Sequence, residues 1–102
     1  MAVVYDNVKQ GAGTGTTIGS GDFTISSSAN RAAIVLLAFL ADPGTISSVT
    51  CGGQSGTLIS GTSGNNTYWW FAAYKVINPA SGTQSASGTW ANSVDAWVGV
   101  VT

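Results

Sequence analysis

The sequence lacks histidine and glutamate altogether and has a single cysteine. Without histidine, nucleophilic catalysis of the Ser–His type is excluded. One cysteine forms neither an intrachain disulfide bond nor a cysteine-based zinc site. Charge is also scarce: three basic and four acidic residues make up 7% of the 102 residues, whereas about 25% is usual. Three scattered cations cannot line a groove for phosphates, so nucleic-acid binding is excluded.

Long apolar runs are absent too. The longest one, residues 32–41, has about half the length that a membrane-spanning helix requires. Residues 1–6 carry neither the positive charge nor the long apolar stretch of a secretion signal. From these two absences we expect no membrane partner, and we expect assembly in the cytoplasm of the cell that makes the protein.

The sequence is instead rich in small neutral polar residues: fourteen glycines stand beside thirteen serines and twelve threonines. Hydrophobic residues make up 44% of the chain, and the net charge is −1. This mixture favours strands over helices and is too apolar for disorder. With so little net charge, electrostatic repulsion does little to keep copies of the chain apart.

Turn-forming residues interrupt the chain at regular intervals, which is typical of a β-sandwich. The turns include Asp42-Pro43-Gly44 and the hairpin signal Gly52-Gly53, and the Gly/Thr/Ser-rich stretch 10–21 is predicted to be a loop. We therefore predict one domain over residues 1–102: an all-β, two-sheet antiparallel sandwich, jelly-roll-like, with seven to eight strands. The predicted strands are residues 1–8, 23–26, 32–40, 46–51, 57–60, 67–77, 83–90 and 93–101.

Two of these strands, residues 32–40 and 67–77, are apolar on both faces. A two-sheet sandwich covers only one face of each strand, so the second faces need partial cover by loops or contact with other subunits. Trp69 and Trp70 point to opposite faces, so at most one of them lies in the core. The predicted assembly interface consists of Val35, Leu37, Phe39, Trp69, Trp70 and Phe71.

The remaining reactive residues give no catalytic or metal-binding pattern. The four aspartates are isolated, and Asp22 and Asp42 lack the D-x-D-x-D spacing of a calcium loop. Residues 11–16 are glycine-rich, but no P-loop lysine and no helix follow them. Cys51 has no neighbour in sequence that would activate a thiol. We expect no enzymatic activity, no cofactor and no metal.

Arg31, the only arginine, precedes the strongest predicted strand. We expect it to form a structural ion pair with Asp6, Asp22 or Asp95, or to anchor a neighbouring molecule through bidentate hydrogen bonds.

Five short motifs follow one another along the chain: Ser28-Ala29-Asn30-Arg31, Val49–Gly53, Trp70-Phe71, Asn78–Thr83 and Ala96–Val101. In this order they resemble a β-sandwich module that recurs in tailed-phage structural proteins and bacterial surface proteins. The resemblance covers residues 2–101 and implies a displayed, assembly-related or adhesive module with no common enzymatic activity. Members of this family often continue into further strands, so an unfinished sheet edge here would invite strand addition between subunits.

The sequence thus predicts a non-enzymatic structural protein of a phage virion. The expected role is capsid decoration, capsid cement or another repeated exterior subunit, with copies of itself and a capsid or other virion protein as partners. The alternatives are a glycan-binding or adhesive surface module, with an outward tryptophan as its platform, and the subunit of an extracellular filament. These alternatives would place the protein outside the cell or at the cell surface.

Overall fold

The computed structural model describes residues 7–27, 31–60 and 70–102. In this part of the chain all regular structure is β, so the predicted all-β class is confirmed. No helix long and apolar enough to cross a membrane occurs among the described residues. The strands are β1 (Val8–Gly19), β2 (Phe23–Ile25), β3 (Ala32–Phe39), β4 (Ile46–Cys51), β5 (Gln54–Ser55), β6 (Thr57–Ser60), β7 (Trp70–Ile77), β8 (Gly82–Gln84) and β9 (Ala86–Val101).

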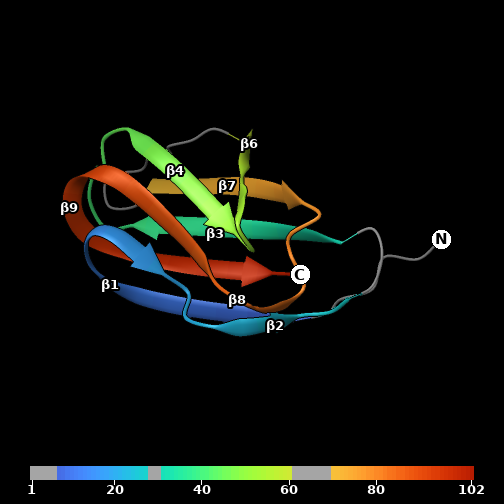
Figure 1. Ribbon diagram of the computed structural model, residues 1–102. Helices are drawn as coiled ribbons and strands as arrows, with labels where there is room; N and C mark the ends of the chain where they lie inside the picture. The colour runs from blue at the N-terminus through green and yellow to red at the C-terminus, as the bar shows by residue number, and fades with distance from the viewer. Residues whose placement is uncertain (1–6, 28–30, 61–69) are drawn as a thin grey trace.

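The main sheet has seven strands in the order β5-β4-β9-β3-β7-β6, with β1 paired to β9. It bends until it is nearly closed into a barrel, and β2 and β8 form a small second sheet. Figure 1 shows the bend, with β4 and the first part of β9 in front of β3, β7 and the end of β9. The described residues form nine strands rather than seven to eight, because β1, β5 and β8 were not predicted as separate strands and the strands predicted over residues 83–90 and 93–101 merge largely into β9. The strand predicted over residues 1–8 lies almost wholly outside the described residues.

Strand β9 produces the bend. The sequence predicted two strands here, residues 83–90 and 93–101, but the structure has one strand of sixteen residues over most of this stretch. The first part of β9 pairs with β4 and its last part pairs with β3. Strand β1 follows β9 through the bend, as Figure 1 shows. The two halves of the ribbon therefore lie in opposite layers of the molecule.

Strand β1 corrects the prediction of a loop over residues 10–21. It is a twelve-residue strand, paired with β9 along its length except for an irregularity between Gly15 and Thr17. At Gly11 a Cβ atom would lie 2.3 Å from the carbonyl oxygen of Gly19. The glycine is needed because the bent strand folds back onto its own backbone, a contact that no side chain would permit.

The two ends of the main sheet are joined at Gly56. Strand β5 pairs with β4 and β6 pairs with β7, and Gly56 alone separates β5 from β6. The amide of Gly56 donates to the carbonyl oxygen of Val49 at 2.7 Å. A Cβ atom at Gly56 would lie 3.2 Å from Cβ of Tyr74. This crossing from one layer to the other nearly closes the barrel.

Both predicted tight turns are confirmed. Gly52 and Gly53 have φ angles of 58° and 75° in the hairpin between β4 and β5. After β3, the carboxylate of Asp42 accepts a hydrogen bond from the amide of Gly44 at 2.9 Å. The carbonyl oxygen of Pro43 accepts one from the amide of Asn92 at 2.8 Å. The second turn is therefore tied to the bend of β9.

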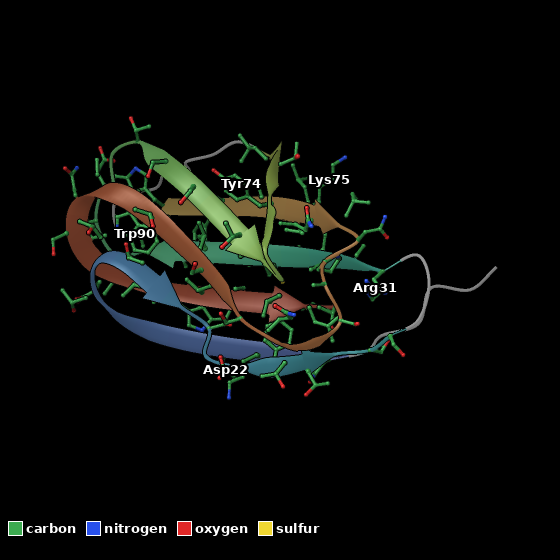
Figure 2. The ribbon with its side chains drawn as sticks, viewed as in Figure 1. Asp22, Arg31, Tyr74, Lys75 and Trp90 are labelled. Carbon is green, nitrogen blue, oxygen red and sulfur yellow. The ribbon has the colours of Figure 1, made fainter. Side chains whose placement is uncertain are left out.

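The core lies between the two halves of the bent sheet. Phe39 and Trp90 meet edge to face, with their ring centroids 4.8 Å apart, and the indole Nε1 of Trp90 donates to the carbonyl oxygen of Gly15 at 2.9 Å. Figure 2 shows Trp90 on β9, near the bent end of the molecule. The other large buried side chains come from five strands, β2, β3, β4, β7 and β9, and include Ile25, Val35, Leu37, Val49, Val76, Val98 and Val100.

Candidate functional site

The layer formed by β1, β9, β3 and β7 has a second face, opposite the core, that we call the outer face. The strand register defines it, because alternate residues of each strand point away from the core. One cross-strand row, for example, runs from Ala12 through Trp97 and Ala38 to Phe71. The outer face consists of Val8, Gln10, Ala12 and Thr14; Asp95, Trp97, Gly99 and Val101; Ala32, Ile34, Leu36, Ala38 and Leu40; and Phe71, Ala73, Lys75 and Ile77.

Exposed hydrophobic side chains concentrate on this outer face. Among the described residues, nine large hydrophobic side chains are exposed, and seven of them lie on it. The other two, Leu58 and Ile59, belong to β6. Contiguous exposed apolar patches larger than a few hundred Å² usually mark a partner surface. The seven are Val8, Ile34, Leu36, Leu40, Phe71, Ile77 and Val101.

The predicted interface had the faces of β3 reversed. Val35, Leu37 and Phe39 are at most 1% exposed and form part of the core, so they do not present a surface to another molecule. The outward residues are Ile34 and Leu36, each 37% exposed. Both faces of this strand are apolar, so its alternation does not say which face meets the second layer.

The other predicted interface residues have different fates. Phe71 lies on the outer face and is 52% exposed. Trp70 points the other way, is partly buried and packs against the core. With Ile46, Leu58 and Tyr74, Trp70 lines a depression of about 450 Å³ between β4 and β7. Trp69 lies outside the described residues.

Trp97 is the outer-face aromatic residue that the sequence did not single out. Its ring lies over Gly99: a Cβ atom there would be 2.2 Å from Cη2 of the indole. The indole Nε1 donates to Oε1 of Gln10 at 3.1 Å, which holds the ring toward that side. On the other side of the ring, small residues such as Ala12 and Ala38 leave a hollow of about 380 Å³.

The outer face carries one charge of each sign among the described residues. Asp95, at the edge of the hollow, accepts a hydrogen bond from the hydroxyl of Thr14. Lys75 is exposed on β7, opposite Ile34, toward the other end of the face. Figure 2 shows Lys75 near the end of β7, beside Tyr74. The patch between the two charges is apolar.

Arg31 anchors its own chain. Its Nε donates to the carbonyl oxygen of Pro79 at 2.8 Å, which ties the start of β3 to the segment before β8. Figure 2 places it at the end of the molecule where β3 begins. Of its predicted partners, Asp6 lies outside the described residues, and Asp95 lies on the outer face beside Thr14. Asp22 lies just before β2, away from Arg31, as Figure 2 shows.

The remaining reactive groups serve local structure. Cys51 is fully buried, and desolvation raises the pKa of its thiol to about 11. Asp42 caps its own turn, as described above. Among the described residues, no three histidine, cysteine, aspartate or glutamate side chains gather where they could hold a metal ion.

The sequence contained a usable signal for the missed part of the outer face. In residues 96–101, Trp97, Gly99 and Val101 alternate with residues that the structure buries: Ala96, Val98 and Val100. The small residue between two large outward ones leaves room for an indole to lie flat on the sheet.

When the chain is compared with protein-family models, with curated proteins and with solved structures, none of the three yields a match.

Proposed function

We propose that this protein is a non-enzymatic structural subunit that assembles by burying its outer face against a neighbouring molecule. The observation that carries the proposal is the concentration of seven exposed large hydrophobic side chains on that face. The proposed contact therefore involves the outward residues of β3, Ile34 and Leu36, in place of the buried residues that the sequence analysis predicted.

The physical basis is removal of apolar surface from water, worth about 25 cal/mol per Å² before the costs of association are subtracted. The interleaved polar residues, Gln10, Thr14 and Trp97, already form hydrogen bonds within the chain. Covering those groups leaves fewer of them without a partner, which lowers the desolvation cost of the contact.

Edge-strand pairing is the second mechanism of assembly in this proposal. The path of the main sheet ends at β5 and β6, of two and four residues, and Gly56 connects them directly. Strand β1, of twelve residues, pairs with β9 alone among the described strands, so its other edge is the longer one that a partner strand could join. For the fold we propose a sandwich, and more specifically a jelly-roll-like one. The support is that the core lies between the two halves of one bent sheet.

For the setting we propose a phage virion, with the protein as a capsid decoration, a cement protein or another repeated exterior subunit. The support is the resemblance of motifs such as Ser28–Arg31 and Ala96–Val101 to phage structural modules. A chain with a net charge of −1 also packs into a dense lattice of copies with little repulsion.

The test is sedimentation velocity of the parent and of a Leu36→Asp, Leu40→Asp variant. The parent should sediment as an assembly and the variant as a 10.3 kDa monomer with an unchanged circular dichroism spectrum. The matched control is Leu58→Asp with Ile59→Asp, because these side chains are at least as exposed (49% and 50%) as Leu36 and Leu40 (37% and 48%) but lie off the outer face. A monomeric parent at all accessible concentrations would contradict the proposal, and open-ended polymers would favour an extracellular filament.

A second candidate function is glycan binding at Trp97, favoured by its flat ring on Gly99 and by the neighbouring Asp95. An indole presents apolar area to a sugar ring, and a carboxylate can accept its hydroxyl hydrogens. Trp97 is here the outward tryptophan that the glycan-binding alternative requires. A glycan array distinguishes the two functions: saturable binding by a monomer, lost in Trp97→Ala and retained in Trp70→Phe, would favour the glycan.

A further inference from the structure

We infer that the molecule covering the outer face is a second copy of this chain, packed face to face about a two-fold axis so that Asp95 of each copy meets the partner's Lys75. The inference rests on the proposed function and names its partner. It is argued from the placement of the two outer-face charges and of the apolar side chains between them.

The strand register places the two charges at opposite corners of the patch. Asp95 lies on β9 and pairs with Thr14, whereas Lys75 lies on β7 and pairs with Ile34. Strand β3 runs between β9 and β7. The line from Asp95 to Lys75 therefore crosses β3 near Leu36 and Ala38, at the middle of the outer face.

A two-fold axis lying in the interface through this midpoint, at right angles to that line, exchanges the two corners. Each carboxylate then faces an ammonium group, and the arrangement occurs twice, as an isologous interface requires. A copy rotated so that equal corners meet would place Asp95 on Asp95 and Lys75 on Lys75. Like charges in contact disfavour that orientation, so the charges select one of the two.

The apolar side chains suit the same orientation. Leu36 and Ala38, next to the axis, pack against the same residues of the second copy. The hollow beside Trp97 lies at the Asp95 corner, so it receives the alkyl stem of the partner's Lys75 while the ammonium group reaches the carboxylate. A surface with an Asp corner, a Lys corner and a hollow at only one of them is complementary to itself.

Charge reversal tests this pairing by sedimentation equilibrium. Asp95→Lys alone and Lys75→Asp alone each place like charges at both contacts, and each should raise the dimer Kd by about tenfold to a hundredfold at low salt. An equimolar mixture of the two variants should form a heterodimer with a Kd near that of the parent. The double variant should form a homodimer with the same Kd. Asp22→Lys, the same charge change at an exposed site off the outer face, is the control.

The outcomes separate this inference from the proposed function. If Leu36→Asp with Leu40→Asp dissociates the parent assembly but neither charge variant weakens it, the two-fold pairing is wrong and assembly stands. If the single variants dissociate and their mixture does not recover, the contact between Asp95 and Lys75 is overturned. If the parent is monomeric throughout, the proposed function and the inference fail together. If the mixture of the two variants recovers a dimer Kd near that of the parent at low salt, and this recovery is lost at high salt, the pairing is confirmed.

Discussion

The two faces of β3 have nearly the same composition and opposite environments. The inward residues, from Ala33 to Phe39, are at most 1% exposed, and the outward ones include Ile34 and Leu36, each 37% exposed. A soluble antiparallel sheet usually alternates apolar and polar residues when one face is wet. The outward face of β3 breaks that rule, which is why we propose a molecular contact for it.

The comparison teaches that hydrophobicity locates a strand but does not assign its sides. Val35 and Leu36 are neighbours of similar character, yet only Val35 meets the opposite layer. What separates them is the bend of β9, which brings β4 over one face of β3, whereas no described strand lies over the other face. Substitutions on either side should therefore have different consequences.

The sharpest contrast is between Leu37→Ala and Leu36→Ala. Removing the buried Leu37 side chain should lower the free energy of unfolding by about 2–5 kcal/mol, because it leaves a cavity between the layers. Leu36→Ala should cost about 1 kcal/mol or less in the monomer, because its side chain is partly in water. Urea unfolding at dilute concentration measures both. Equal losses would mean that the two faces are not distinct.

The next contrast is between two glycines, Gly11 on β1 and Gly99 on the outer face of β9. Gly11→Ala should destabilise the fold by about 1–3 kcal/mol, because the new methyl group would meet the backbone of Gly19. Gly99→Ala should cost less, because the group in the way is the Trp97 ring, which can rotate outward. Thermal unfolding measures the difference, and the tryptophan fluorescence of Gly99→Ala should report the displaced ring. A Gly11→Ala protein as stable as the parent would refute the folded-back strand.

The two tryptophans of β9 give a smaller difference. Trp90→Phe removes the hydrogen bond to Gly15 in the interior and should cost about 0.5–1.5 kcal/mol. Trp97→Phe removes the exposed bond to Gln10, and the free energy of unfolding of the monomer should hardly change. Chemical denaturation of both variants side by side is the measurement. A larger loss for Trp97→Phe would place that ring in the core.

The smallest effect at neutral pH comes from the buried Cys51. Its folded-state pKa of about 11 lies above the ordinary value of 9.0, so between these values the folded state holds more protons than the unfolded one. The free energy of unfolding should therefore fall as pH rises through this range, by no more than about 1.4 kcal/mol per pH unit. Burial raises the pKa of Tyr74 too, and this acts in the same direction.

Denaturation curves at pH 8 and pH 10.5 measure this dependence. Cys51→Ala is the control and should have a shallower slope, because only the contribution of Tyr74 remains. An identical slope in both proteins would show that Cys51 ionises equally in the folded and unfolded states.

Much of the candidate site could be predicted from the sequence, but which face of each strand points outward could not. The apolar character of both β3 and β7 follows from their residues. The contribution of Trp97 was visible as alternation over residues 96–101 but carried no sign of its direction. The contact between Gly11 and Gly19 could not be predicted, because sequence does not distinguish a glycine that permits close backbone approach from a glycine in a loop.

The amino-acid sequence by itself determined the all-β class, the tight turns at Gly44 and Gly52-Gly53, and the surplus of apolar strand surface. These depend on local preferences and on the period of two along a strand, which each segment carries alone. Only the tertiary structure decided that residues 86–101 are one bent strand, that residues 8–19 are a strand, and which side of β3 is inward. A pattern of period two is unchanged when its faces are exchanged, so the choice depends on which layer arrives to cover it.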